Sequence, residues 1–550
     1  MIIIKRLVTR LTLTALMIPA AYASIPDCAD DQNGTISPVQ NLVNGCYIYA
    51  SEIEPSSMAK SVLKLWAADG VQLSSAQEVI DQLNRLAIYS PGYGVNNVTW
   101  VSNTDNFVNY NGLDHVINSG ANSDGVAVLA VGQQSFESSY GIEDSAYTFQ
   151  AALNFVNTYR TSASKIATLG HSLGGITIRY ALADMEEKNI PHNVGLYVSN
   201  DAPHRGAYVP QSLQQILPVL ESYKNDLSVL EPSISAFFTT WGVSISFSAT
   251  LNTILSVPDA LEGELEQASS MLRNKVGKQL LIDHVLGTAE RTSFMTTLTT
   301  LGYPTQATNI AITSGSVEGV MQSVHDLNAN GAYYEFFGKK GDNVDSAYFG
   351  AHFVLYPTVA GEQNLYSKFS GWVQKKAPCA WPLNFLTCTS TNETSITPRI
   401  RTTSMTAQEL DGIPGSTIEW PEGSMTIGGN TFPFGGAPGK MLEQVTSGAF
   451  VPASDKVELE HIDENYNFPF IPTYSALDID RPITQADSVV QALADLAGDT
   501  VYVDTNNKLA GISDIESLHF HDIYVNDANS NHLNVRWPAG VVSAIKGAVD

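Results

Sequence analysis

The stretch ASKIATLGHSLGGITIRYALAD, Ala163 to Asp184, decides the fold of this chain. Its first part is an apolar, β-branched run at Lys165–Leu169 that predicts a buried strand. Its last part, from Gly175, has the composition of a helix. A five-residue turn centred on Ser172 joins the two, so the stretch predicts a strand, a tight turn and a helix in direct succession.

The turn has the pattern Gly-x-Ser-x-Gly, from Gly170 to Gly174. In a strand–turn–helix setting this pattern is a nucleophile elbow, in which a strained serine stands clear of the backbone. Glycines are expected at both ends because strand and helix pass too close for side chains. The positive end of the helix dipole faces the place where an oxyanion would form. We therefore interpret Ser172 as a nucleophile, with an inert turn as the alternative.

The composition sets the broad class. The chain has 550 residues, of which 44% are hydrophobic and 15% charged, so it can bury a large core. Its length suggests two to four domain-sized units, or one large domain with insertions. The formal net charge of −26 argues against a nucleic-acid partner and favours a soluble protein in a saline or extracellular setting.

The first residues have the pattern of a targeting signal. Lys5 and Arg6 precede an apolar run at Leu11–Ile18, and Ala21-Tyr-Ala23 provides a small-residue cleavage site. The apolar run is too short to cross a bilayer. We expect residues 1–23 to be removed after Ala23 and the mature chain, without a transmembrane span, to be secreted or periplasmic.

The four cysteines form two close pairs, Cys28/Cys46 and Cys379/Cys388. In an exported protein, disulfides Cys28–Cys46 and Cys379–Cys388 are the expected pairing. Zinc is the weaker alternative, because no nearby histidine or second thiol completes a tetrahedral set.

Strands and helices alternate through much of the chain. Such alternation predicts a doubly wound, mostly parallel sheet, with its functional site at the carboxyl ends of the strands. The expected strands are 86–90, which runs into a Pro/Gly turn at 91–94, and then 125–131, 165–169, 194–199 and 309–313, while the expected helices are 57–66, 75–86, 106–117, 145–159 and 292–301.

Two long segments interrupt this alternation. Residues 207–291 are apolar, and 232–258 contain no charged residue, so we expect a helical lid or cap, or an ordinary insertion core. Many Ser and Thr residues argue against a membrane span there. As a lid, the segment could contact a lipid interface peripherally. Residues 335–467 are rich in Gly, Pro, Thr and aromatics and predict a β-rich insertion.

A family resemblance rests on two further motifs. Ala202-Pro-His-Arg-Gly206 resembles the T-P-H-x-G turn of bacterial lipases, and Phe470–Asp478 is similar to the late V-P-x-x-S-A segment of lipase-like enzymes, including the lecithin–cholesterol acyltransferase group. The chain thus resembles exported bacterial lipases and esterases of the α/β-hydrolase superfamily, over roughly 85–200 and, more weakly, 292–320 and 468–535. By this resemblance His204 shapes the turn and is not the base.

The resemblance divides the chain into segments. It implies an N-terminal helical leader at 24–84, a hydrolase core in three parts, and the two insertions between those parts. The core parts are 85–206, 292–334 and 468–550.

The resemblance also implies a set of site residues. His532, in Asn-His-Leu near the end of the chain, is the expected triad histidine. The family places the acid just before the late segment, but Phe468 and Pro469 stand there in this chain, so the sequence departs from the pattern. The best candidate for the displaced acid is Asp478, with Glu318 and Asp522 as alternatives. The backbone N–H groups of Leu173 and Tyr93 are expected to bind the oxyanion, with an ordinary type II turn as the alternative for the Tyr93 loop.

The expected function is a secreted serine hydrolase that cleaves small-molecule or lipid carboxylic esters through an acyl-enzyme and needs no cofactor. An amidase, thioesterase or acyltransferase at the same serine is an alternative. So is a non-catalytic exported binding protein with the same fold. His519 and His521 could bind a metal with Asp522, but solvated strand histidines are the preferred interpretation, and no metal site is predicted.

Overall fold

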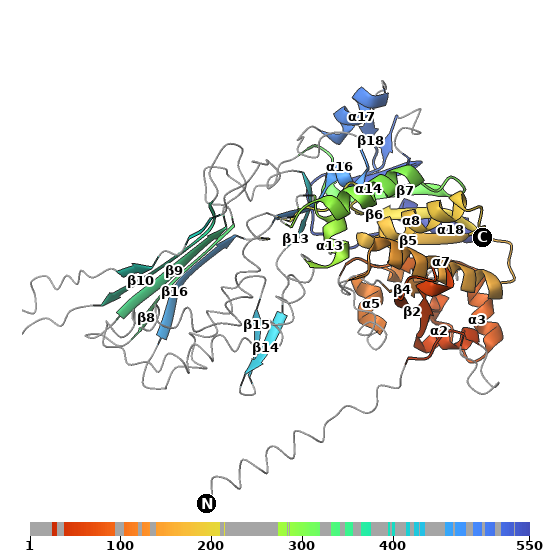
Figure 1. Ribbon diagram of the computed structural model, residues 1–550, viewed down its shortest axis with the longest axis horizontal. Helices are drawn as coiled ribbons and strands as arrows, with labels where there is room; N and C mark the ends of the chain where they lie inside the picture. Colours follow the sequence, from red (N-terminus) through yellow and green to blue (C-terminus); the bar gives the residue numbers. More distant parts are fainter. Residues whose placement is uncertain are drawn as a thin grey trace, which may run out of the picture.

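The computed structural model has a central sheet flanked by helices, with further strands from the second half of the chain (Figure 1). In the part of the chain that the structure describes, no helix is long and apolar enough to cross a membrane. The described residues are 25–29, 38–93, 104–118, 124–132, 139–209, 214, 273–282, 284, 286–319, 332–340, 347–355, 365–375, 394–396, 399–401, 414–418, 423–427, 430–434, 457–465, 468–479, 488–497, 501–511, 519–532 and 534–550.

The central sheet has eight strands in the order β1-β2-β4-β3-β5-β6-β7-β20. Only β2 runs antiparallel to its neighbours, and the pairs from β4 to β20 are parallel. This confirms the predicted doubly wound, mostly parallel sheet. Its strands are β1 (Cys46–Tyr49), β2 (Lys60–Trp66), β3 (Leu86–Ser90), β4 (Ala127–Val131), β5 (Ile166–His171), β6 (Val194–Asn200), β7 (Thr308–Ser316) and β20 (Asp522–Asn526).

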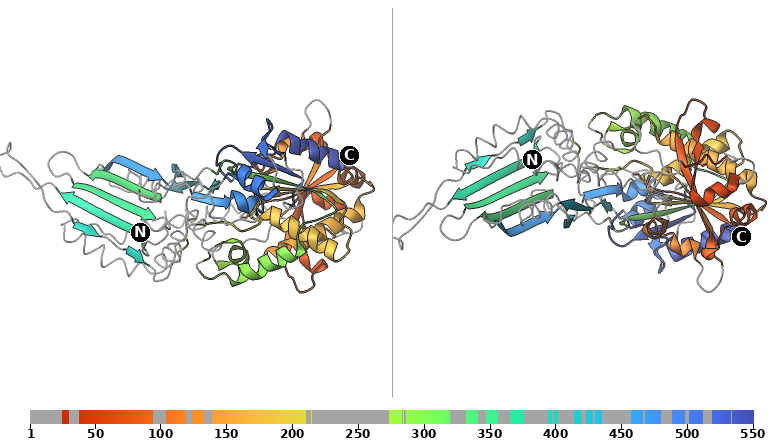
Figure 2. Two further views of the ribbon diagram at one scale, coloured as in Figure 1. Left: turned by 90° about the horizontal axis from the view of Figure 1, so that it is seen from above. Right: turned by 90° about the horizontal axis from the view of Figure 1, so that it is seen from below.

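Helices cover both faces of this sheet (Figure 2). One core cluster packs α3 (Ala76–Leu83), α7 (Ile142–Tyr159), α8 (Leu173–Glu187) and α14 (Ala289–Leu301) against the sheet. The other packs α5 (Thr104–Tyr110), α6 (Asp114–Ile117) and the last helix α18 (Ala539–Val549) against the opposite face.

Strand β3 shows why the expected strands lack alternation of polar and apolar residues. Leu86 and Ile88 enter the first cluster, whereas Ala87 and Tyr89 enter the second, and all four are fully buried. A strand covered on both faces is apolar at every position, as parallel sheets require.

Two predicted helices are wrong. Residues 57–66 were expected to be helical, but Lys60–Trp66 form β2, so the segment 24–84 contributes two strands to the sheet. The strand buries Val62 on one face and Leu63 and Leu65 on the other. A strand buried on both faces has no alternation of polar and apolar residues, so its apolar residues can fit the spacing of a helix. The helix expected at 106–117 is divided into α5 and α6, because Gly112 takes a φ of 61° between them.

The described part of segment 335–467 consists of strands. Strands β11 (Thr394–Ile396), β10 (Leu365–Lys375), β9 (Ala347–Leu355), β8 (Ala332–Lys340) and β16 (Val457–Asn465) pair in that order, and β12 (Arg399–Arg401) also pairs with β10. A hairpin joins β14 (Gly423–Ile427) to β15 (Asn430–Phe434). Strand β13 (Gly415–Ile418) instead pairs antiparallel with β17 (Phe468–Pro472), which leads back to the central sheet.

Smaller elements complete the described chain. They are the short helices α2 (Asn41–Asn44), α13 (Lys275–Leu280), α16 (Thr473–Ala476) and α17 (Val489–Ala497), the 3-10 helices η2 (Pro38–Gln40), η3 (Ala50–Glu52) and η4 (Ala68–Gly70), and the strand pair β18 (Tyr502–Val503) with β19 (Leu509–Ala510).

One predicted disulfide is confirmed. Cys28 and Cys46 are bonded and tie the chain before η2 to strand β1. The Cys379–Cys388 pair, the signal peptide at 1–23 and most of the expected lid at 207–291 lie outside the described residues.

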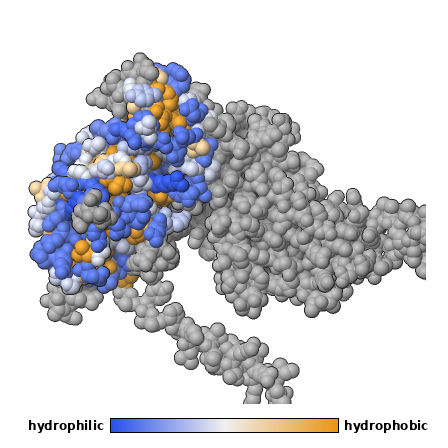
Figure 3. Space-filling view, turned by 180° about the vertical axis from the view of Figure 1, so that it is seen from behind, coloured by the Kyte–Doolittle hydropathy of each residue, from blue (hydrophilic) through white to orange (hydrophobic). Residues whose placement is uncertain are grey.

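On the face that Figure 3 shows, the described surface is mostly hydrophilic, with several separate apolar areas, the largest near the top of the view. The large hydrophobic side chains that are most exposed among the described residues are Met58, Val71, Tyr110, Leu286 and Tyr502. They come from different parts of the chain, which is ordinary for a soluble surface.

Candidate active site

Ser172 occupies a strained turn between β5 and α8. Its φ of 54° and ψ of −125° lie in a region that residues with a side chain rarely adopt, and its side chain is buried. A Cβ on Gly174 would lie 1.9 Å from the Ser90 carbonyl oxygen, and one on Gly170 would lie 2.5 Å from the Gly175 Cα. The predicted reason for these two glycines, close backbone approach, is therefore confirmed.

The loop after β3 approaches the serine. A Cβ on Gly92 would lie 3.1 Å from the Ser172 Cβ and 3.6 Å from its Oγ, so a side chain at position 92 would crowd the serine. Tyr93 follows, and its hydroxyl accepts a hydrogen bond from the Asn274 side chain at 2.6 Å. Leu173 is the first residue of α8, where a helix N–H has no partner within its own helix. Both predicted oxyanion donors thus lie in segments beside Ser172.

His532 lies in the loop that follows β20. Its backbone N–H donates to the Thr417 carbonyl in β13 at 2.7 Å, and the Thr417 N–H donates to Ser530 at 2.9 Å. The ring is buried and meets the Phe470 ring of β17 edge to face, with 4.9 Å between the ring centroids. The β13–β17 pair therefore holds the loop that carries this histidine.

Asp201 is the carboxylate that contacts His532. Its Oδ2 lies 2.6 Å from the His532 Nδ1, and its Oδ1 accepts a hydrogen bond from the Ser314 backbone N–H at 3.0 Å. The side chain is fully buried. Burial alone would raise its pKa, but the hydrogen bond and charge of His532 and the bond from Ser314 outweigh burial and lower the pKa below its usual value. The acid thus stays ionised at neutral pH.

The strand register brings this acid to the serine's edge of the sheet. His171 in β5 pairs with Asn200 in β6, so Ser172 and Asp201 each follow directly after paired positions. The Ser172 N–H donates to the Asn200 carbonyl at 2.9 Å. Both side chains therefore project from the carboxyl ends of neighbouring parallel strands.

The prediction that Asp478 holds the imidazole is wrong. Its carboxylate instead accepts hydrogen bonds from the Arg179 guanidinium and the Tyr303 hydroxyl, each at 2.9 Å. This largely buried ion pair ties the α16 end to α8, and although burial opposes ionisation, the nearby Arg179 charge lowers the pKa of Asp478. Of the alternative acids, Asp522 pairs with Lys508, and Glu318 lies exposed after β7.

His171 packs against the imidazole of His532. The two rings stack with centroids 4.8 Å apart. Burial, and secondarily the His532 charge, lower the pKa of His171 to about 3, so it stays neutral. The residue before Ser172 in the chain therefore presents an uncharged, flat ring to the His532 imidazole.

His204 takes the structural position expected of it. Its Nε2 lies 2.7 Å from the Ser199 Oγ, and its Nδ1 faces the Arg179 guanidinium at 3.5 Å. Burial, and then the Arg179 charge, lower its pKa to about 3.

His519 and His521 lie just before β20. His519 stacks on Tyr303, and the His521 Nδ1 accepts the Asn309 backbone N–H. Within the described residues no group of three or more His, Cys, Asp or Glu side chains could hold a metal ion.

Sequence reasoning missed Asp201. A signal for it was present, because Asp201 comes two positions after the predicted strand 194–199. The carboxyl ends of such strands form the edge of the sheet where functional side chains usually lie. The late motif at Phe470–Asp478 drew the assignment to Asp478 instead.

These features define the class of the protein. A doubly wound sheet carries a serine on a nucleophile elbow, an acid after the next strand and a histidine after the last one, in the order Ser…Asp…His along the chain. That order on this sheet is the one found in α/β-hydrolases. The protein therefore has the α/β-hydrolase fold, with a serine, an aspartate and a histidine in the order typical of that fold.

The comparison with protein families agrees with this class. A family described as "Putative serine esterase (DUF676)" matches residues 113–235, less than a quarter of the chain, which includes Ser172 and Asp201 but not His532. No curated protein matches the sequence significantly.

Solved esterases show partial likenesses. Est1E from Butyrivibrio proteoclasticus is 16% identical over 29% of this chain and 50% of its own, with a TM-score of 0.19. An esterase from the archaeon Pyrobaculum calidifontis is 14% identical over 29% of this chain and 43% of its own, with a TM-score of 0.20. EstE1, a carboxylesterase from a metagenomic library, is 15% identical over 49% of this chain and 67% of its own, with a TM-score of 0.24. The chain thus spans half or less of the first two, and the class rests on the sheet and the site.

Proposed function

We propose that this protein is a secreted serine hydrolase that cleaves carboxylic esters through an acyl-enzyme. The observation that carries the proposal is the buried His532–Asp201 pair at the sheet edge where the elbow presents Ser172. A hydroxyl nucleophile, an imidazole and a buried carboxylate that orients it are the groups that acyl transfer requires.

The geometry of the pair supports a division of roles. An ionised carboxylate only accepts hydrogen bonds, so the His532 Nδ1 carries the proton toward Asp201 and leaves Nε2 with a free lone pair. In the proposed reaction, Nε2 takes the Ser172 hydroxyl proton while Oγ attacks the ester carbonyl carbon. The same proton then goes to the leaving alcohol, and an acyl-serine remains for water to hydrolyse.

The proposed oxyanion donors are the backbone N–H groups of Leu173 and Tyr93. Leu173 begins α8, whose dipole adds positive potential at that point. Each such donor is worth roughly 3 kcal/mol of barrier. No cofactor enters the proposed reaction.

The location and the lipid contact remain part of the proposal. Export with cleavage after Ala23 is supported by the basic and apolar pattern of residues 1–23, and the Cys28–Cys46 disulfide suits an oxidising compartment. The uncharged stretch 232–258 supports a cover that contacts lipid or buries acyl chains.

The test combines chemistry and labelling. Folded wild-type protein is expected to hydrolyse p-nitrophenyl acetate or butyrate and to bind a fluorophosphonate covalently, while Ser172→Ala loses both. The matched control is Ser293→Ala, which replaces an exposed serine in helix α14. Unchanged turnover in Ser172→Ala would remove the assignment, and a folded wild type that is inert to both reagents would favour a non-catalytic binding protein.

A further inference from the structure

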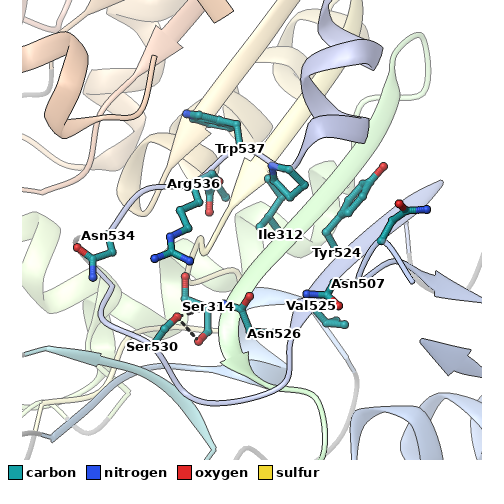
Figure 4. Close-up of a pocket in the computed structure, with 13 residues that line it drawn as sticks. Ile312, Ser314, Asn507, Tyr524, Val525, Asn526, Ser530, Asn534, Arg536 and Trp537 are labelled. Atoms are coloured by element: carbon teal, nitrogen blue, oxygen red, sulfur yellow. Dashed lines mark hydrogen bonds between the residues drawn. The ribbon is translucent and has the colours of Figure 1, made fainter. Parts of the chain in front are cut away.

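A cavity of about 300 Å³ lies outside the triad, behind the loop that carries His532. Its walls come from the ends of β6, β7 and β20, the β18–β19 turn and the segment before α18 (Figure 4).

Arg536 is the one charged residue in this lining. Its guanidinium extends into the cavity on the side of Ser314 and Ser530 (Figure 4). Within the part of the chain that the structure describes, the Arg536 side chain has no carboxylate partner. A guanidinium presents paired N–H donors that fit the two oxygens of a carboxylate.

Two acids in the segments that border the cavity are already engaged. Asp522 pairs with Lys508 at 2.6 Å, and the Asp504 carboxylate accepts the backbone N–H groups of Asn506 and Lys508 at 2.7 and 3.1 Å. Arg536 is therefore the charge that the lining itself carries, and the exposed Asp527, next to Asn526, lies outside the lining.

The rest of the lining divides into polar and apolar parts. The side-chain amides of Asn507 and Asn534 offer hydrogen bonds at the rim, where both residues are exposed. Ile312, Val525 and Trp537 offer apolar surface. A single cation beside apolar walls suits one negative charge on a small apolar body, because a dianion would find no second cation in the lining.

We propose that this cavity binds a small monocarboxylate through Arg536. The site is separate from Ser172 and shares walls with the His532 loop, since Ser530 donates both its N–H and its hydroxyl to the Ser314 carbonyl, at 2.9 and 3.0 Å. The proposal does not depend on the proposed esterase activity.

The test measures binding to the full chain by calorimetry and by the shift in melting temperature. Benzoate is the probe, benzamide its neutral isostere and inorganic phosphate the competing anion. Benzoate is expected to bind saturably, and both benzamide and phosphate at least about tenfold more weakly. Arg536→Gln should weaken benzoate binding about tenfold or more. Arg536→Lys should have an intermediate affinity, because lysine keeps the positive charge but lacks the paired N–H donors of the guanidinium.

Matched controls keep the result interpretable. Arg85→Gln removes one positive charge from a surface pair with Asp550 and should leave benzoate affinity unchanged. Arg536→Gln should keep the melting temperature of the ligand-free wild type, because the side chain is exposed. Benzoate that does not bind, binds equally to Arg536→Gln, or binds no better than benzamide or phosphate would overturn the proposal.

Discussion

The Nδ1 atom of His532 lies 2.6 Å from Oδ2 of Asp201, although 331 positions separate the two residues in the chain. In the proposed reaction this contact makes Asp201 the acid that orients the imidazole. We predict that Asp201→Asn lowers kcat for p-nitrophenyl butyrate by about 10⁴-fold, because an amide favours the wrong imidazole tautomer. Circular dichroism and thermal melting should show a folded variant. A loss of less than tenfold would contradict the role of Asp201.

The same logic predicts a different result at Asp478. Its carboxylate is paired with a buried Arg179 at 2.9 Å, so Asp478→Asn leaves an uncompensated charge and should lower the free energy of unfolding by roughly 3 kcal/mol or more. Turnover per folded molecule should fall less than tenfold at low temperature. Denaturant unfolding and active-site titration with a fluorophosphonate separate the two effects. A catalytic loss equal to that of Asp201→Asn would restore Asp478 as the acid.

The backbone strain at Ser172 predicts an unusual stability ranking. Ser172 has a φ of 54° and a ψ of −125°, which glycine adopts without strain. The Ser172→Gly variant should therefore have an unfolding free energy about 1 kcal/mol higher than that of Ser172→Ala, because the relief of strain outweighs the entropy that glycine adds to the unfolded chain. At Ser293, exposed in α14, the order should reverse by about the same amount. Urea titration of the four variants provides the measurement. The same order at both sites would show that the elbow is unstrained.

Two buried neutral histidines predict that the protein loses stability on acidification at pH values above those at which the carboxylates titrate. The pKa values of His171 and His204 are each lowered from 6.5 to about 3, mainly by burial. Between these pH limits the unfolded chain binds protons that the folded chain does not, so stability falls as pH drops from 6.5 toward 3. Each histidine contributes a slope of at most about 1.4 kcal/mol per pH unit.

The check uses urea unfolding across this pH range. His204→Gln should reduce the slope by roughly half of the histidine contribution, while His115→Gln, whose side chain is 76% exposed, should leave it unchanged. Asp201 and Asp478, whose pKa values are lowered, add a separate loss only below pH 3.8. A flat stability between pH 6.5 and 4.5 would contradict burial of neutral imidazoles.

The Cys28–Cys46 bond predicts a loss of stability on its removal. The bonded residues are 18 positions apart, and opening such a loop costs roughly 3 kcal/mol through the entropy of the unfolded chain. Cys28→Ser with Cys46→Ser should lower the unfolding free energy by about this amount and leave ester turnover intact, because β1 is at the far edge of the sheet. A change below about 0.5 kcal/mol would show that the bond adds little.

The sequence by itself determined the features that are local. The Gly-x-Ser-x-Gly turn with its strand and helix, the parallel strands and the Cys28–Cys46 bond were all predictable, because each depends on neighbouring residues or on apolar runs of strand length. The strand at Lys60–Trp66 was not, because burial on both faces removes the alternation that tells a strand from a helix.

Only the tertiary structure decided which acid meets the histidine. Asp201 and Asp478 are both aspartates with positive φ, and the local signal for Asp201, its place just after the predicted strand 194–199, did not outweigh the late motif that ends at Asp478. The register of β5 with β6 places Asp201 beside Ser172, and the β13–β17 pair holds the His532 loop over it. Arg179 meanwhile captures Asp478. The deciding contacts join Arg179 to Asp478 over 299 positions and Asp201 to His532 over 331 positions. Contacts at such separations depend on how the strands pair and on which charges are buried together, and they follow no periodic pattern along the chain.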